Sequence, residues 1–334
     1  MKAAVLTRYD KSGRDLEVCD IALPDTGPDE VLVRILTAGV NPLDNMIVRG
    51  EVKMIVPYRL PLTMGNEFVG IVEKMGSNFS GFSVGERVYG RMPLKRIGAF
   101  AEYAAVHKEA IAHVPAYLTD EEAACVPLTA CTALQALELM QPKPGETVFI
   151  SGGTGSLGAM AIPVAKSMGL EVITNGNATN RDRVLALGAD RFIDYKTEDY
   201  ATVLTDVDHV LDTLGDTELP KEFSVLKQGG RLVSLRGLPN GEFAARSRMS
   251  VPKRLLFKLA GLKYDRMAAK RGQRYYFVFV HEDGPGLERI SDIFEKARIK
   301  PSVDGVFALD EVNEALHKVA AGRSKGKTII RIST

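Results

Sequence analysis

Hydrophobic residues in the first 120 positions occur in short runs that glycine and proline interrupt. Representative runs are VLVRILTAGV (31–40), FVGIVEKMG (68–76), GERVYG (85–90) and FAEYAAV (100–106). Short apolar segments separated by turn residues are typical of antiparallel strands. This part of the chain is therefore predicted to form an all-β, partly open barrel or sandwich with few helices.

From residue 123 the pattern changes to apolar strands that alternate with helices. A helical run, AACVPLTACTALQALELM (123–140), ends before Pro142 and Pro144. Strand-like segments follow, namely TVFIS (147–151), EVITN (171–175), FIDY (192–195), HVLDT (209–213), GRLVSL (230–235) and RYYFVFV (274–280). Such alternation indicates an α/β domain with a parallel sheet that is covered on both faces. A last helix over residues 286–297 precedes a glycine- and proline-punctuated end.

Length and composition narrow the class of protein. The chain has 334 residues, enough for two domains, and 45% hydrophobic and 25% charged residues are ordinary for a globular protein. A net charge of +1 gives no global attraction for nucleic acid. The three cysteines, without CxxC spacing, argue against a disulfide scaffold, and no targeting signal or long apolar span is visible. We therefore expect a cytoplasmic protein.

A glycine-rich turn, SGGTGSLG (151–158), follows the strand TVFI and opens a helix. In this context Gly153 permits the tight turn, Gly155 lets the backbone approach a pyrophosphate, and Gly158 packs the helix on the strand. The helix N-terminus then faces the anion. The alternative is a glycine-rich turn that binds nothing. The predicted cofactor-binding residues here are Gly152, Gly153, Thr154, Gly155, Ser156, Leu157 and Gly158.

The second strand of this domain indicates which dinucleotide binds. NAD sites place an acidic residue about 20 residues past the turn, on the ribose hydroxyls. Here that strand ends in ITNGN (173–177), which has no acid, and Arg181 and Arg183 follow closely. The arginines could meet a 2′-phosphate, or they could be ordinary solvated charges. The missing carboxylate favours NADPH over NADH.

These segments together resemble the medium-chain dehydrogenase/reductase superfamily, in its zinc-free, quinone-oxidoreductase-like branch. The similar motifs are AGVNPLD (38–44), GNEFVG (65–70), VGERV (84–88), the glycine turn, LGAD (187–190) and GK (326–327). The resemblance implies a Rossmann doubly wound parallel sheet inserted into a GroES-like β-barrel domain. The barrel would comprise residues 1–121 and 283–334 and the NADPH-binding domain residues 122–282, with the active cleft between them.

The resemblance also implies roles for single residues. Asn41 matches an asparagine near the nicotinamide ribose, and Thr129 a threonine that contacts the nicotinamide ring. Some relatives have a tyrosine near the substrate at the position of Met46, so the resemblance does not identify a proton donor in this chain. A lysine usual near the 2′-phosphate aligns with Asn180, which leaves phosphate affinity to Arg181 or another group. The cofactor-binding candidates outside the turn are Asn175, Gly176, Asn180, Arg181, Tyr195 and Gly237.

The motifs that hold zinc in other members of the superfamily are replaced. Those members have a cysteine at the position of the segment NPLD (41–44) of this chain, and a His-Glu pair at the position of Asn66-Glu67. His107 and His113 have no partner cysteine, and core packing is expected for Cys125 and Cys131. We therefore predict that the chain binds no metal.

Without a Lewis acid, the most accessible reaction is hydride transfer to a quinone or enone, because such an acceptor is already activated and needs little further polarisation by the protein. Asn41 and Thr129 are the candidate donors to the developing enolate. Two alternatives are an enoyl-thioester reductase, for which Tyr58 lies near but displaced from the expected tyrosine, and a non-catalytic dinucleotide-binding protein.

A basic segment, residues 246–274, lies in an insert expected at 240–274 and holds ten Lys and Arg against the single acid Asp265. Apolar residues recur within it at helical spacing, which predicts a basic amphipathic helix. A mobile cap over the substrate cleft, a weak contact with an anionic membrane surface and an oligomer contact are all compatible with it. The basic residues lack the regularly interleaved aromatic residues of nucleic-acid-binding surfaces, which argues against nucleic-acid binding by this segment.

The last predicted strand, residues 274–280, is apolar on both alternating faces and should lie at the sheet edge. An exposed apolar edge favours a homodimer in which the same strand of each subunit pairs. The alternative is that the basic insert covers the edge and keeps the chain monomeric.

Overall fold

The computed structural model describes all residues except 14, 216, 323–325 and 334. The chain divides into two compact units, Met1–Cys131 with His281–Thr334, and Thr132–Val280. Residues 122–131, which the sequence analysis assigned to the Rossmann domain, belong to the first unit. One reason is that the Leu128 N–H donates to the buried carboxylate of Glu67, in the first unit, over 2.7 Å.

The first unit is built from two sheets. The smaller has the strand order β2 (Glu17–Asp20), β1 (Lys2–Leu6), β4 (Leu62–Thr63). The larger has the order β15 (Val303–Ala308), β16 (Lys327–Arg331), β3 (Glu30–Val40), β5 (Glu67–Met75), β6 (Arg87–Arg91), β8 (Ile111–His113), and β7 (Tyr103–His107) also pairs with β3. Because β16 pairs with β3, the C-terminal segment completes the predicted β-barrel domain.

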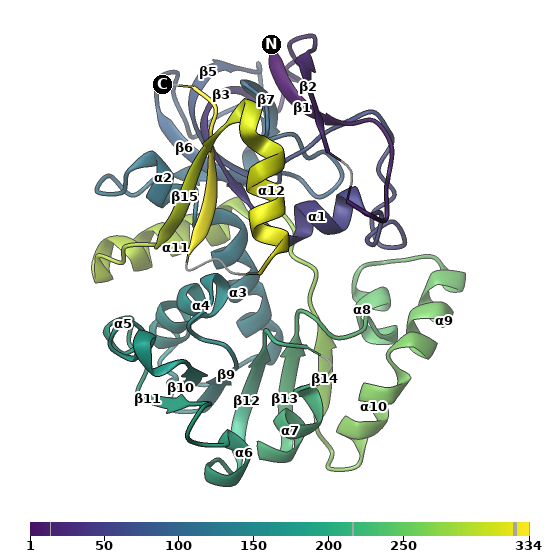
Figure 1. Ribbon diagram of the computed structural model, residues 1–334, viewed down its shortest axis with the longest axis vertical. Coiled ribbons are helices and arrows are strands. Elements are labelled where there is room, and N and C mark those ends of the chain that lie inside the picture. Colours follow the sequence, from purple (N-terminus) through teal and green to yellow (C-terminus); the bar gives the residue numbers. More distant parts are fainter. Residues whose placement is uncertain (14, 216, 323–325, 334) are drawn as a thin grey trace. The chain divides into compact units, whose positions relative to one another are not determined.

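Few helices accompany these sheets, as the punctuated sequence predicts. They are α1 (Pro42–Val48), α2 (Asp120–Ala123), the first residues of α3 (Pro127–Met140), α11 (Gly284–Ala297), α12 (Val312–Ala320) and the short 3₁₀ turns Lys108–Ala110 and Leu309–Glu311 (Figure 1). The continuous helix predicted over 123–140 is instead two helices, with Cys125 in the turn between them. Pro127 explains the break, because proline is favoured in the first turn of a helix and not in its interior.

The second unit contains one parallel sheet of six strands. Its order is β11 (Arg191–Asp194), β10 (Glu171–Gly176), β9 (Thr147–Ile150), β12 (Val207–Asp212), β13 (Leu226–Ser234), β14 (Arg274–Phe277). Numbered within the unit, this is 3-2-1-4-5-6, the order of the predicted Rossmann fold. Its helices are the remainder of α3, α4 (Ser156–Ser167), α5 (Arg181–Ala186), α6 (Tyr200–Val203), α7 (Leu219–Val225), α8 (Gly241–Arg246), α9 (Val251–Ala260), α10 (Leu262–Ala269) and the 3₁₀ turn Ala178–Asn180.

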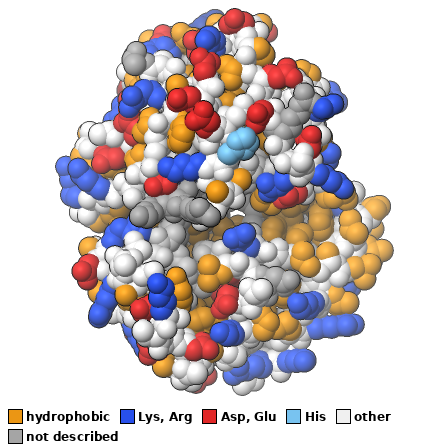
Figure 2. Space-filling model, viewed as in Figure 1, with side chains coloured by type: hydrophobic (Ala, Val, Ile, Leu, Met, Phe, Trp, Pro, Cys, Tyr) orange, Lys and Arg blue, Asp and Glu red, His pale blue; other side chains and the backbone are white. Residues whose placement is uncertain are grey.

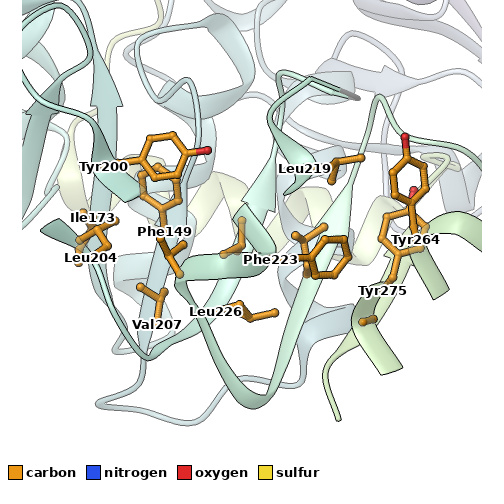
Figure 3. Close-up of a cluster of buried hydrophobic side chains, with 14 of the residues drawn as sticks. Phe149, Ile173, Tyr200, Leu204, Val207, Leu219, Phe223, Leu226, Tyr264 and Tyr275 are labelled. Atoms are coloured by element: carbon orange, nitrogen blue, oxygen red, sulfur yellow. The ribbon is translucent and has the colours of Figure 1, made fainter. Parts of the chain in front are cut away.

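The basic insert is part of the core of this unit. Tyr264 of α10 is buried against Tyr275 of β14, with ring centroids 5.1 Å apart. Tyr275 in turn lies 6.3 Å from the ring of Phe223 on α7 (Figure 3). The insert is therefore anchored to the sheet through large buried side chains.

The predicted edge position of β14 is confirmed, but the strand is shorter than expected. It ends at Phe277, because its partner β13 ends at Ser234. Two side chains of the insert region also donate to its carbonyls, Asn240 to Tyr275 over 3.2 Å and Arg246 to Phe277 over 2.8 Å. The insert thus occupies two of the edge carbonyls of β14, as the monomeric alternative requires.

One segment of the described residues, Asp120–Met140, is long and apolar enough by composition to cross a membrane. Of its most apolar window, 89% is buried inside the protein. Packing in the protein core accounts for this apolar character.

Candidate functional site

The glycine turn joins β9 to α4 with very close backbone packing. A Cβ on Gly153 would lie 1.8 Å from the Thr174 hydroxyl oxygen, and one on Gly158 would lie 2.4 Å from the Cα of Gly153. Gly152 has φ +73°, in the left-handed region that glycine tolerates. These three positions require glycine for the protein's own packing.

Gly155 differs from the other glycines of the turn. A Cβ there would meet only the Gly152 carbonyl, at 3.4 Å, and its φ of −74° suits any residue. As N-cap of the twelve-residue helix α4 it offers no side chain to the first N–H groups. Because no atom of the described residues fills the space beside Gly155, a ligand can approach the backbone there. The first N–H groups of α4 have no side-chain cap, so they are available to bind an anion. The turn therefore fits the pyrophosphate of a dinucleotide.

Residues at the end of β10 hold this turn in place. The Asn175 side-chain oxygen accepts the N–H of Gly152 over 2.7 Å. A Cβ on Gly176 would lie 2.1 Å from the Thr154 methyl group. Arg183 donates to the Thr154 carbonyl over 2.5 Å, so this arginine braces the turn. Asn175 and Gly176 are thus placed beside the turn, as the cofactor assignment requires.

The residues predicted around the 2′-phosphate lie near the same edge of the sheet. Asn180 is the N-cap of α5, and Arg181 is its first residue and is exposed. Tyr195, 57% exposed, follows β11, and its N–H donates to the Gly176 carbonyl over 3.2 Å. Since β10 ends in Asn175 and Gly176, no carboxylate at that end of the strand would repel a phosphate.

Gly237 lies past β13, in a loop that a buried polar network organises. The Ser234 hydroxyl donates to Asp212 over 2.5 Å and accepts the N–H of Gly237 over 2.7 Å. The other oxygen of Asp212 accepts the N–H groups of Leu214 and Gly215. The sequence analysis missed Asp212 and Ser234, although each ends a strand, where ligands bind in such sheets.

In the first unit, Asn41 belongs to a fully buried cluster with Glu67 and Lys327. The amide nitrogen of Asn41 donates to Glu67 over 2.7 Å, and Lys327 donates to the amide oxygen over 2.6 Å. Lys327 also lies 2.5 Å from the Glu67 carboxylate. Both ends of the Asn41 amide are therefore engaged within the protein.

Asp44 is the second buried carboxyl beside this cluster. It accepts the N–H of Asn41 over 2.8 Å and the side-chain amide of Asn66 over 2.7 Å. Burial, with a smaller contribution from the charge of Glu67, raises the pKa of Asp44 to about 7, although these hydrogen bonds and Lys327 lower it. Asp44 can therefore exchange a proton near neutral pH.

Thr129 lies in the first turn of α3 and is 6% exposed. Its hydroxyl donates to the Cys125 carbonyl over 2.6 Å, which leaves the oxygen as an acceptor. The adjacent Leu128 N–H binds Glu67, the same carboxylate that holds Asn41. The structure thus brings Asn41 and the residue before Thr129 to one buried carboxylate, and the side-chain donors of Asn41 and Thr129 are both used within the protein.

Arg91, like Asp212 and Ser234, was not among the site residues predicted from the sequence. Its side chain is fully buried, Nη1 donates to the Met92 carbonyl, and Glu282 lies 4.0 Å away. Nε and Nη2 have no hydrogen-bond partner among the described residues. Arg91 pairs with Glu67 in the β5–β6 register, so both side chains are on one face of the sheet. The signal available in the sequence was an arginine ending the apolar strand VYGR.

The residues considered as metal ligands are engaged otherwise. Asn66 and Glu67 bind Asp44 and Lys327, as described above. Cys125 and Cys131 are buried, and burial raises the pKa of the Cys125 thiol to about 12. Among the described residues, no three His, Cys, Asp or Glu side chains are grouped as a metal site would need.

Comparison with known proteins identifies two family matches. Residues 27–116 match the family described as alcohol dehydrogenase GroES-like domain, and residues 187–330 match the family described as zinc-binding dehydrogenase. The curated relatives include 2-methylene-furan-3-one reductase of Solanum lycopersicum, 30% identical over 93% of this chain and 74% of the relative.

Another curated relative is the chloroplastic NADPH-dependent alkenal/one oxidoreductase of Arabidopsis thaliana, 27% identical over 99% of this chain and 79% of the relative. Among solved structures, the quinone oxidoreductase of Coxiella burnetii has a TM-score of 0.81 at 24% identity, covering 100% of this chain and 99% of that one. At this identity the similarity concerns the fold.

Proposed function

Because the chain belongs to the medium-chain dehydrogenase/reductase superfamily, we propose that it reduces an activated carbonyl compound, a quinone or an α,β-unsaturated ketone, with NADPH and without metal. The observation that carries this proposal is the glycine turn. Three of its glycines are required by packing, whereas a Cβ on Gly155 would make only one ordinary contact, which leaves room for a pyrophosphate at the N-terminus of α4.

The choice of NADPH rests on charge. The end of β10 offers Asn175 and Gly176 in place of a carboxylate, and exposed Arg181 begins the next helix. The name of the Arabidopsis relative, an NADPH-dependent alkenal/one oxidoreductase, supports the same cofactor and substrate class. When bound, NADPH supplies a hydride from the nicotinamide ring.

The chain's own residues would supply position and hydrogen-bond donors. Glu67 and Lys327 hold the Asn41 amide from both ends, so its orientation is fixed. Two nitrogens of Arg91 have no hydrogen-bond partner among the described residues, and we assign Arg91 as the donor to the substrate oxygen as negative charge develops there. A charged donor lessens the need for a Lewis acid when the acceptor is already activated.

The function is tested by following NADPH oxidation with three sets of acceptors, namely quinones, enones and enoyl thioesters. Turnover confined to quinones and enones supports the proposal. Preferential turnover of thioesters indicates an enoyl-thioester reductase, and NADPH binding without any turnover indicates a non-catalytic protein.

The role of Arg91 is tested with Arg91→Met, a substitution that removes the buried charge but keeps much of the volume. We expect kcat/KM to fall by about 10- to 100-fold with unchanged NADPH affinity, since a hydrogen bond to a charged group contributes about 1.5–3 kcal/mol. Arg91→Lys should recover part of the loss. Arg96→Met is the control, because Arg96 is 53% exposed. An active Arg91→Met enzyme refutes the assignment.

Two further proposals concern the cellular compartment and the oligomeric state of the protein. The unpaired cysteines, Cys19, Cys125 and Cys131, suit a reducing compartment, and we propose the cytoplasm. We also propose a homodimer, which the edge position of β14 supports; the donors from Asn240 and Arg246 favour the monomeric alternative.

A further inference from the structure

Helix α9 carries an apolar face that points away from the protein. Its exposed apolar side chains are Val251, Leu255, Leu256 and Leu259, with exposed fractions of 75%, 60%, 46% and 63%. Figure 2 shows hydrophobic side chains gathered over the position that α8 and α9 occupy in Figure 1. We call these four side chains the α9 ridge.

The ridge lies opposite the side of α9 that packs on the protein. Phe257 is the buried residue of α9, and its ring meets Phe243 of α8 at 6.1 Å. At 3.6 residues per turn, the ridge covers an arc of roughly 140° whose centre lies opposite Phe257. A surface helix of a globular protein normally shows the reverse arrangement, with its apolar stripe toward the core. The ridge is therefore not explained by packing within this unit.

Basic side chains surround the ridge. Arg254 and Lys258 of α9 are exposed beside it, and α10 adds exposed Lys263 and Arg266. Residues 246–274 hold ten Lys and Arg against one acid, whereas the whole chain has a net charge of only +1. In Figure 2, Lys and Arg side chains lie next to the hydrophobic area, over α10. A local excess of positive charge thus surrounds the exposed apolar face of α9.

We propose that the α9 ridge docks this protein on an anionic lipid bilayer. Leucines that enter the interface between headgroups and acyl chains, flanked by cations that meet lipid phosphates, are the arrangement of interfacial amphipathic helices. The ten-residue helix is far too short to span a bilayer, so it would lie in the plane of the surface.

The insert is suited to this role because it is fixed to its unit. Phe243 also meets Phe277 of β14, at 5.1 Å, and Asn240 donates to Asp265 over 2.7 Å. A rigid ridge enters the bilayer with little loss of conformational entropy. A second copy of the chain suits the ridge less well, because two such basic surfaces would repel each other when paired.

The test measures sedimentation of the full chain with vesicles of two compositions. We expect binding to vesicles of equal parts phosphatidylglycerol and phosphatidylcholine, little binding to phosphatidylcholine alone, and weakening by high salt. The assay needs no turnover, so its result is independent of the proposed reaction.

Two double variants separate the contributions. Leu255→Ser with Leu259→Ser should lower the partition coefficient by more than about tenfold, because both side chains leave the bilayer. Arg254→Glu with Lys258→Glu should lower it by at least about tenfold on anionic vesicles. Val84→Ser, which alters a 60% exposed side chain of the first unit, is the matched control and should bind like the wild type.

Three results would overturn the proposal. Wild-type protein could fail to sediment with anionic vesicles, or the leucine variant could sediment as well as the wild type. Alternatively, the leucine variant could convert a dimer to a monomer, or change kcat/KM with a soluble enone, while vesicle binding stays intact. That last pattern would identify the ridge as an oligomer contact or a substrate cap.

Discussion

Two alanine substitutions in the glycine turn should have opposite effects. Gly153→Ala places a methyl group 1.8 Å from the Thr174 hydroxyl, which itself donates to the Ile150 carbonyl over 2.7 Å. Overpacking costs about 1–3 kcal/mol and the lost hydrogen bond about 1 kcal/mol. We expect Tm to fall by roughly 5–10 °C.

Gly155→Ala should leave the fold intact. The nearest atom to the new methyl group is the Gly152 carbonyl oxygen at 3.4 Å, an ordinary contact, and φ is −74°. Tm should therefore stay within about 2 °C of the wild type. The methyl group instead occupies the approach to the helix N-terminus, where loss of one charge-assisted hydrogen bond is worth about 1.5–3 kcal/mol. The Kd for NADPH should then rise by about 10- to 100-fold.

Circular dichroism gives Tm for both variants, since the chain has no tryptophan for fluorescence, and titration calorimetry gives the Kd. A folded Gly155→Ala protein with wild-type affinity would show that no pyrophosphate lies on this turn. An unchanged Tm for Gly153→Ala would contradict the close packing against Thr174.

Four other outcomes are expected. Arg181→Ala should raise KM for NADPH several-fold and leave that for NADH nearly unchanged; equal effects on both would exclude a phosphate contact. Burial raises the pKa of Asp44 from 3.8 to about 7, so the contribution of Asp44 to stability should fall as the pH rises from about 4 through 7. Asp44→Asn removes this contribution, and its amide can pair with the Asn66 oxygen, which has no partner among the described residues. The variant should therefore be more stable than the wild type at pH 8, by up to about 4 kcal/mol, and the difference should vanish near pH 4. Metal analysis should find well under one zinc per chain, and a chelator should leave activity intact; stoichiometric zinc would reverse the mechanism. Light scattering should give a mass of twice 36.4 kDa, as expected for a homodimer, whereas a mass of 36.4 kDa would mean that the insert covers β14.

Much of the fold could be predicted from local patterns in the sequence. The glycine spacing after an apolar strand predicted the turn and the helix it opens, because tight turns and close backbone packing restrict the residue type at each position. The alternation of strands and helices predicted a parallel sheet covered on both faces, and the family resemblance implied its Rossmann strand order. The break at Pro127 could also have been anticipated from proline geometry, yet the apolar run around it concealed the two helices.

The partners of the site residues were decided by tertiary structure. Asn41 and Lys327 are 286 positions apart in the chain, and only the pairing of β16 with β3 brings Lys327 to the Glu67 carboxylate. Composition could not show that two nitrogens of Arg91 find no partner in the described part of the chain, because that depends on which groups surround Arg91 after folding. Likewise, a helical pattern of leucines predicts an amphipathic helix but not which side faces the protein. Phe257 settles that, because its packing on Phe243 turns the leucines outward.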